Sequence, residues 1–144
     1  MATAGDVLRD KDITEVFSIA PGATVLEALH IMAERKIGAL IVIEDGQVVG
    51  ILSERDYARK VALMERSSYT TEVRDIMTHD VLTVDSLTPI EVCMSLMTER
   101  RLRHLPVLDQ GRLQGMVSIG DLVKAIISRQ QNMIDQLEQY IRGS

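Results

Sequence analysis

The sequence is poor in cysteine and in aromatic residues, and it has no excess of positive charge. The single cysteine, Cys93, excludes an internal disulfide, and no cluster of Cys and His has the spacing of a zinc site. The chain has three Tyr, one Phe and no Trp, and its 21 acidic residues outnumber 16 basic ones. Such a composition offers nucleic acid neither a positive surface nor a stacking platform. We therefore expect no metal ion, no nucleic-acid partner and a reducing compartment.

Long apolar runs are absent as well. The longest apolar stretch, residues 37–43, ends at two acidic residues and is far shorter than the roughly 18 residues of a membrane span. Residues 1–20 carry interspersed acids and no apolar core, which argues against a signal or transit peptide. These features predict a cytoplasmic protein that does not contact a membrane. A chain of 144 residues can bury a core without a metal or a disulfide.

The short signatures of common catalytic sites are also missing. The sequence contains no GxSxG, GxxxxGK[ST], HExxH or GxGxxG stretch. His30 is expected on a helix surface, His79 has no evident partner, and Cys93 is most simply a small buried residue. We therefore predict that the chain is not an enzyme.

What the sequence does contain is an internal repeat. Residues 16–63 align with residues 81–128 without a gap, and ten of the 48 pairs are identical. Most other pairs keep their apolar or polar character, and this pattern decides a fold. Two similar halves are therefore expected to pack about a pseudo-twofold axis.

Each copy has the pattern strand, helix, strand, strand, helix, so the fold class is α/β (α+β) with two β-α-β-β-α repeats. In the first copy, residues 16–19 form a strand, and Thr24 with Glu27 forms a capping box at the start of a helix. The apolar face of this helix comprises Val25, Leu29 and Met32. In the second copy, Thr88 takes the capping position and Pro89 the first helical position.

A β-hairpin follows in each copy. The first joins residues 39–43 to residues 48–52, and the second joins residues 104–108 to residues 113–117. The turns are Asp45-Gly46 and Gln110-Gly111. Because the strands are almost continuously apolar, we expect both of their faces to be covered.

The last helix of each copy starts at Ser53 and at Ser118, and the second of these extends to about Arg142. Its C-terminal part has an apolar stripe, which we interpret as a dimer contact, formed by Met133, Ile134, Leu137 and Ile141. The predicted organisation is a first repeat at 6–63, a polar linker at 64–71, a second repeat at 72–128 and a C-terminal helical extension at 129–144.

The two helix starts share a Ser-x-x-Asp pattern, Ser53 with Asp56 and Ser118 with Asp121. A helix N-terminus exposes N–H groups that hold a phosphate, and the aspartate one turn later can accept hydrogen bonds from ribose hydroxyls. The same pattern is also an ordinary N-terminal cap. Sequence duplication alone preserves a cap, so both interpretations stay open.

A basic cluster precedes the second hairpin, just before Pro106. It consists of Arg100, Arg101, Arg103 and His104. Arginine offers a planar fork for phosphate oxygens, but cations also complement the dipole at the end of a helix. We leave Arg100 and Arg101 open between these roles and favour an anion site for Arg103 and His104. The first copy has only Arg35 and Lys36 at this place, so two such sites are not equivalent.

Several motifs resemble the tandem cystathionine β-synthase (CBS) domain pair, or Bateman module. They are residues 73–78 (VRDIMT), 81–84 (VLTV), 103–107 (RHLPV), 115–121 (GMVSIGD) and 50–56 (GILSERD). The resemblance covers about residues 6–127. We expect no catalytic or DNA-binding domain beside the pair, and in this respect the chain resembles the stand-alone CBS-pair proteins of bacteria and organelles.

This resemblance implies a sensor that binds AMP, ADP, ATP, NAD(H) or S-adenosylmethionine in two composite clefts. One cleft is expected to use Asp56, Ser53, Arg55, Val81, Leu82, Leu102, Arg101, Arg103, His104 and Pro106. The other is expected to use Asp121, Ser118, Gly120, Phe17, Ile37, Gly38 and Ala39. Ile41 stands where the family pattern has proline, and only Lys36 supplies charge, so the Asp121 cleft is expected to be weaker, differently selective or empty.

The sequence thus predicts a non-catalytic regulatory module, a homodimer that acts on an unknown regulated protein. It has no catalytic cofactor, and the adenosyl nucleotide is its regulatory ligand. His104 is expected to add a pH dependence to phosphate binding. The alternative is a dimerisation or docking module for a partner enzyme that binds no nucleotide. An enzyme whose site assembles across the dimer is a third possibility.

Overall fold

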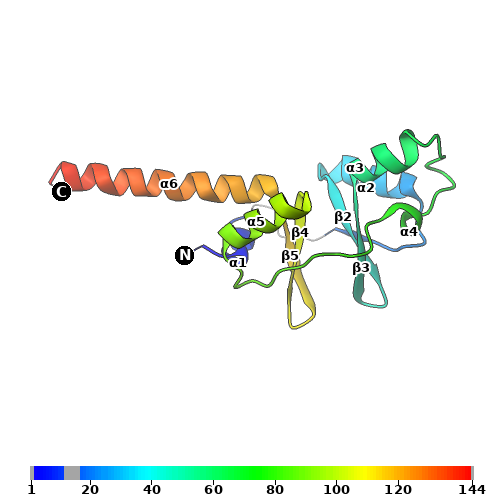
Figure 1. Ribbon diagram of the computed structural model, residues 1–144, viewed down its shortest axis with the longest axis horizontal. Helices are drawn as coiled ribbons and strands as arrows, with labels where there is room; N and C mark the ends of the chain where they lie inside the picture. Colours follow the sequence, from blue (N-terminus) through cyan, green and yellow to red (C-terminus); the bar gives the residue numbers. More distant parts are fainter. Residues whose placement is uncertain (1, 12–16, 144) are drawn as a thin grey trace. The chain divides into compact units, whose positions relative to one another are not determined.

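A computed structural model describes residues 2–11 and 17–143 of the chain (Figure 1). The chain divides into two compact units, Glu15–Leu82 and the combination of Met1–Thr14 with Thr83–Ser144. The N-terminal helix α1 (Ala4–Asp10) thus belongs to the unit of the second repeat. The boundaries at 6–63 and 72–128 concern the repeat in the sequence and stay a prediction.

The first unit is a three-stranded sheet with helices. Strand β1 (Ser18–Ile19) pairs in parallel with β2 (Ala39–Glu44), which pairs antiparallel with β3 (Gln47–Ser53). Helix α2 (Val25–Arg35) precedes β2. Helix α3 (Glu54–Tyr57) follows β3, continues as the π-helical segment η1 (Ala58–Ala62), and is succeeded by α4 (Val73–Ile76). The core includes Val25, Met32, Leu40, Leu52 and Ile76.

The second unit contains α1, α5 (Ile90–Arg100), a hairpin of β4 (His104–Asp109) and β5 (Arg112–Ser118), and α6 (Ile119–Ile141). Helix α1 docks through its backbone: the Ala4 N–H donates to the Thr88 carbonyl at 2.8 Å, and the Gly5 N–H donates to the Ser86 carbonyl at 2.9 Å. A Cβ at Gly5 would lie 2.9 Å from the Ser86 carbonyl oxygen, so only glycine permits this approach.

Both predicted hairpins are confirmed. Asp45 and Gly46 have φ of 52° and 77°, and Gln110 and Gly111 have φ of 52° and 78°. Two consecutive positive φ values are the requirement of a tight hairpin turn, which Asp-Gly and Gln-Gly meet because glycine has no Cβ. The expected burial of both faces is confirmed for residues 39–42 and 105–107, whereas β3 and β5 leave every second residue at least partly exposed.

The repeat alignment predicts a strand at 81–84 as the counterpart of the strand at 16–19, and this prediction is wrong, because only Val84 forms a bridge, with Val107. In the first repeat the Ile41 N–H donates to the Phe17 carbonyl at 3.3 Å. The residue aligned with Ile41 is Pro106, which has no N–H to donate, so the ladder cannot extend. The first strand itself is confirmed at Ser18–Ile19, and Val16 lies outside the described residues.

The start of α5 also differs from the prediction. Pro89 is the N-cap of α5, and the Thr88 hydroxyl instead bonds to Asp85. The repeat explains the shift, since Thr24, the N-cap of α2, aligns with Pro89 rather than Thr88. Thr24 accepts from the Glu27 N–H at 3.2 Å, but within the described chain Glu27 returns no bond, so its capping box is only half formed.

The apolar face predicted for the helix at 25–35 holds with one adjustment. Val25 and Met32 are buried, whereas Leu29 is half-buried and Ala28 takes a core position. His30 is exposed as expected, and Cys93 is fully buried. Burial is the main cause that raises the pKa of the Cys93 thiol, so it is an unreactive core residue.

Candidate functional site

The two Ser-x-x-Asp sequences form complete capping boxes. The Ser53 Oγ accepts from the Asp56 N–H at 3.2 Å, and the Asp56 carboxylate accepts from the Ser53 N–H at 2.9 Å. In the second unit the Ser118 Oγ accepts from the Asp121 N–H at 3.1 Å, and Asp121 accepts from the Ser118 N–H at 2.8 Å. The capping role is therefore a property of the structure, while the ribose role stays a prediction.

Each of these aspartates also contacts a lysine. Lys60 Nζ lies 3.4 Å from Asp56 Oδ1 and donates to the Ile76 carbonyl at 2.8 Å. Lys11 Nζ lies 2.9 Å from Asp121 Oδ2 and donates to the Met116 carbonyl at 2.9 Å. The aspartate side chains are only 14% and 23% exposed. Two half-buried carboxylates are thus fixed in orientation by a backbone N–H and an ammonium group.

Sequence reasoning missed both lysines. Lys60 lies four residues after Asp56, in the π-helical segment η1 that continues α3, and this spacing is a usable signal for an ion pair. Lys11 lies outside the repeat, and its ammonium group contacts the carboxylate of Asp121, which is far from it in the sequence. No local pattern indicates that contact, because it depends on where α1 docks.

Within each unit, the start of the last helix lies beside the turn that precedes the hairpin. The Glu54 N–H donates to the Gly38 carbonyl at 3.1 Å, and the Ile119 N–H donates to the Arg103 carbonyl at 2.8 Å. His104 pairs with Ser118 across the β4–β5 ladder. The structure thus brings two groups of predicted residues together inside each unit.

The predicted residues are divided between the units as follows. The unit of the first repeat contains Phe17, Ile37, Gly38, Ala39, Ser53, Arg55, Asp56, Val81 and Leu82, and the other contains Arg101, Leu102, Arg103, His104, Pro106, Ser118, Gly120 and Asp121. Pro106 and Ala39 are buried, whereas Arg55, Arg101, Arg103 and Gly120 are exposed. The composite clefts that combine the two groups stay a prediction.

The basic residues of the two repeats differ in their surroundings. Arg35 lies over the ring of Phe17, 4.9 Å from its centroid. Arg100 is the last residue of α5 and Arg101 its C-cap, with a φ of 54°, and both are exposed. Arg100 and Arg101 therefore stand where cations complement a helix dipole, and their phosphate role stays a prediction.

The surroundings of His104 shift the pKa of its imidazole ring downward. Burial is the largest cause that lowers its pKa, Lys11 and Arg103 lower it further, and Asp121 opposes them. The ring is therefore neutral at pH 7. The positive charge that is expected to aid phosphate binding develops only in more acidic solution. For Asp121, burial raises the pKa, but hydrogen bonds from Ser118 and Lys11 outweigh it and the net shift is downward.

The structure offers no competing site of metal or membrane type in the part of the chain that it describes. No three or more His, Cys, Asp and Glu side chains are grouped to hold a metal ion there. Nor does any helix between residues 2–11 or 17–143 combine the length and apolar character needed to cross a membrane.

A duplicated unit with the same capped helix start in each copy defines a tandem α/β repeat protein. The family model described as the CBS domain matches residues 4–63 and 73–128. The chain belongs to the CBS domain family, and it contains two CBS domains.

Known proteins of this family are similar over most of the chain. The mitochondrial CBS domain-containing protein CBSX3 of Arabidopsis thaliana is 41% identical over 125 residues, which are 83% of this chain and 61% of that protein. The chain therefore spans less than two thirds of this relative. A solved structure of a protein with CBS domains from Burkholderia ambifaria is 46% identical to this chain and covers 88% of this chain and 95% of its own, with a TM-score of 0.86.

A more distant structure contains ligands. The CBS domain pair of protein MJ0100, in complex with 5′-methylthioadenosine and S-adenosyl-L-methionine, is 22% identical, with a TM-score of 0.77. It covers 90% of this chain and 98% of its own. At this identity the likeness concerns the fold.

Proposed function

We propose that this chain is a non-catalytic regulatory module that binds an adenosine-containing ligand, namely AMP, ADP, ATP, NAD(H) or S-adenosylmethionine. The observation that carries the proposal is the pair of oriented carboxylates, Asp56 and Asp121, at two equivalent helix starts. A carboxylate held in this way can accept hydrogen bonds from the two hydroxyls of a ribose. The same fold holds two adenosyl compounds in the MJ0100 pair.

The phosphate-binding side is proposed to differ between the two clefts. Arg101 and Arg103 are exposed and free of ion pairs within the described residues, whereas Arg35 stacks on Phe17. Only Lys36 then remains for the Asp121 cleft. The cleft that uses Asp56 is therefore proposed to prefer the phosphate-rich ligand.

The binding test compares three aspartates that each accept a hydrogen bond from the backbone N–H three residues earlier, of which only Asp56 and Asp121 are proposed to bind the ligand. Asp75 closes a capping box with Glu72 at the start of α4, so Asp75→Asn removes the same kind of box as Asp56→Asn or Asp121→Asn. Charge-assisted hydrogen bonds are worth about 1.5–3 kcal/mol, so we expect one of the two site variants to weaken ligand binding by about tenfold or more. Calorimetric titration with each of these ligands measures this, and Asp75→Asn should leave the affinity unchanged.

Two results would contradict the proposal. The first is that the wild-type chain binds none of these ligands at millimolar concentration. Equal affinities in all three aspartate variants are the other, because the carboxylates would then act only as caps. Either result favours the second candidate, a docking module that binds no nucleotide.

The docking candidate has its own supporting observation. The C-terminal half of α6 exposes Ile134, Leu137 and Ile141 by 48%, 56% and 81%. In this candidate, regulation of the partner protein survives the double variant Asp56→Asn/Asp121→Asn. In the sensor candidate, that regulation loses its dependence on the ligand.

The proposal also includes a homodimer and an unidentified regulated protein. The ligand acts by binding one conformation of the repeats better than another, which is all that a population shift requires. The cytoplasm remains the predicted compartment, although the name of the Arabidopsis relative places that protein in mitochondria.

A further inference from the structure

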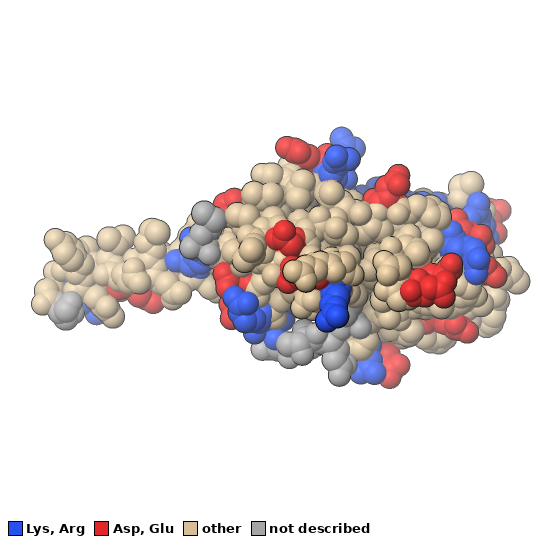
Figure 2. All heavy atoms as spheres, turned by 90° about the horizontal axis from the view of Figure 1, so that it is seen from below, with Lys and Arg blue, Asp and Glu red and all other residues tan. Residues whose placement is uncertain are grey.

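Helix α6 carries an apolar stripe that is left uncovered within the described chain. Of its 23 residues only Leu122 is buried, and every residue from 127 to 143 is exposed. Figure 1 shows α6 extending well past α1, α5 and the β4–β5 hairpin of its own unit. Figure 2 shows few charged side chains on the visible face of this extension. Since a helix in water gains most of its stability from packing its apolar face, the extension needs a partner.

The spacing of the stripe specifies another helix as that partner. Its positions alternate by four and three residues: Val123, Ile127, Gln130, Ile134, Leu137 and Ile141. This alternation is the a/d repeat of a coiled coil, which keeps an apolar seam on one line along a neighbouring helix. The apolar members of the seam are 42% to 81% exposed.

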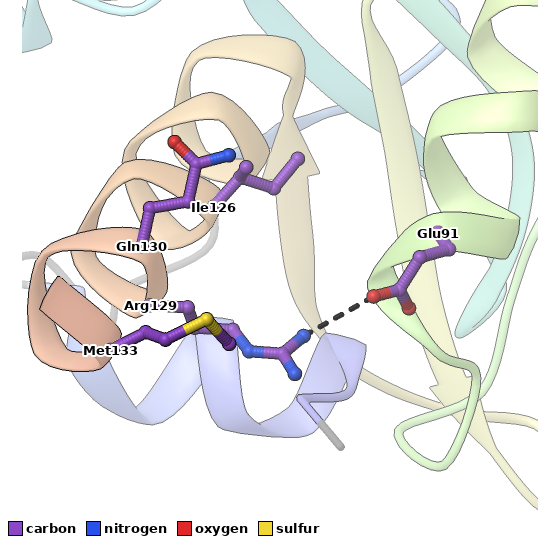
Figure 3. A pocket seen from close by; sticks show the side chains of 5 residues that line it. All are labelled: Glu91, Ile126, Arg129, Gln130 and Met133. Atoms are coloured by element: carbon purple, nitrogen blue, oxygen red, sulfur yellow. Dashed lines mark hydrogen bonds and ion pairs between the residues drawn. The ribbon is translucent and has the colours of Figure 1, made fainter. Parts of the chain in front are cut away.

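The charges beside the seam specify the direction of the partner helix. Lys124 and Glu138 occupy the same heptad position, two heptads apart, and neither makes an ion pair within the described residues. Arg129 is different, because it bonds to Glu91 of α5 at 3.2 Å (Figure 3). In a parallel pair, Glu138 would lie next to the uncharged Met133 of the partner subunit. In an antiparallel pair, Lys124 lies next to Glu138 of the partner subunit. The twofold axis repeats this contact, so that Glu138 also lies next to Lys124 of the partner subunit.

The seam and the charges agree on one register. When the helices cross symmetrically at residue 132, Ile127 faces Leu137 of the partner subunit and Val123 faces Ile141 of the partner subunit. The same register brings Tyr140 of the partner subunit beside Ile126. A pocket of about 230 Å³ opens there, lined by Glu91, Ile126, Arg129, Gln130 and Met133 (Figure 3). A tyrosine ring then has both a cavity and polar neighbours for its hydroxyl.

We propose that α6 pairs with α6 of a second copy of this chain as an antiparallel coiled coil centred near residue 132. This inference rests on the homodimer proposed above and not on nucleotide binding. It assigns the apolar seam, the two unpaired charges and the pocket to one interface.

The first experiment measures dimer dissociation by analytical ultracentrifugation. Lys124→Glu or Glu138→Lys places like charges together on both sides, so we expect either variant to weaken the dimer by about tenfold. The double variant restores opposite charges and should return to within about threefold of wild type. Asp135→Lys makes the same charge change as Glu138→Lys, but away from the seam, and should have no effect. Leu137→Asp should give a monomer.

The second experiment fixes the direction by disulfide cross-linking. An antiparallel pair brings Ile127→Cys of one copy next to Leu137→Cys of the other, so only a mixture of the two variants should cross-link. A parallel pair would cross-link each variant alone. The native Cys93 is buried and does not interfere.

The outcomes separate this inference from the proposed function. A wild-type chain that stays monomeric at all concentrations overturns the interface and the homodimer. A dimer that is not weakened by Lys124→Glu or Glu138→Lys overturns the antiparallel geometry only. Cross-linking of Ile127→Cys alone or of Leu137→Cys alone has the same consequence. Ligand affinity measured on the same samples tests the proposed function separately.

Discussion

Gly50 and Gly115 occupy equivalent positions in the two repeats, but their surroundings differ. A Cβ at Gly50 would lie 2.5 Å from the Met77 sulfur and 3.0 Å from the Thr78 carbonyl oxygen. A Cβ at Gly115 would lie 2.8 Å from a terminal methyl group of Leu8 and would meet no backbone atom within 4 Å among its three nearest contacts. Alanine at these two positions therefore tests how the loss of stability depends on the neighbour of the new methyl group. At Gly50 the neighbours include a backbone atom, and at Gly115 the neighbour is a side chain.

The structure indicates which substitution costs more. The Ile51 N–H donates to the Thr78 carbonyl at 3.1 Å, and the Thr78 N–H donates to the Ile51 carbonyl at 2.9 Å, so this backbone cannot move away without breaking two hydrogen bonds. Met77 is 7% exposed and must change rotamer inside the core. Overpacking of this kind costs about 1–3 kcal/mol. We expect Gly50→Ala to lie near the upper end of that range and Gly115→Ala near or below the lower end.

Thermal unfolding followed by circular dichroism measures the difference. At this chain size about 1 kcal/mol corresponds to roughly 2–4 °C, so Gly50→Ala should lower Tm by several degrees more than Gly115→Ala. A double-mutant cycle with Met77→Ala sharpens the test, because the new methyl group fills part of the space that Met77 leaves, and the two losses should not add. Equal Tm losses at the two glycines, or additive losses in the cycle, would show that the Thr78 backbone and Met77 do not restrict position 50.

Three further predictions concern the unit of the second repeat. Because burial lowers the pKa of His104 below its usual 6.5, the unfolded chain takes up the proton first as the pH falls. The free energy of unfolding should therefore decline below about pH 6.5, by at most about 1.4 kcal/mol per pH unit, until the folded-state pKa is passed. Urea titrations at several pH values should show a shallower decline in His104→Asn, and an identical decline would count against the shift. Ser118→Ala removes a helix cap and should cost about 1 kcal/mol, whereas Ser128→Ala, exposed within the same helix, should cost nothing; equal effects in thermal melts would contradict the capping role. Lys11→Met removes a hydrogen bond and a charge that hold down the pKa of Asp121, so an NMR titration of that carboxyl carbon should show a higher pKa than in wild type, and an unchanged value would mean that the contact is absent in solution.

Much of the fold could be predicted because its signals are local. The Asp45-Gly46 and Gln110-Gly111 turns need positive φ at two adjacent residues, and the sequence supplies glycine at the second position of each turn. The serine caps at Ser53 and Ser118 bond to N–H groups three residues later. Each of these features is complete within one turn of chain, so residue types at fixed spacing predict it.

The errors arose where one residue changes a repeated pattern. Pro106 lacks the N–H that Ile41 uses, so the expected strand at 81–84 reduces to one bridge. Thr88 precedes the true cap, Pro89, by one residue. The repeat alignment contains both facts, because Pro106 aligns with Ile41 and Pro89 with Thr24, so the two copies differ in the backbone N–H groups that they can donate.

For the candidate site, the two Ser-x-x-Asp helix starts could be read from the residue types alone, since their geometry depends on residues within one turn. The contacts of Lys11 with Asp121 and of Met77 with Gly50 are known only from the folded chain. These contacts join residues far apart in the chain, and they form because α1 and the segment after η1 pack where buried surface and backbone hydrogen bonds are available. No spacing rule encodes that choice, because it depends on the packing of the whole unit at once.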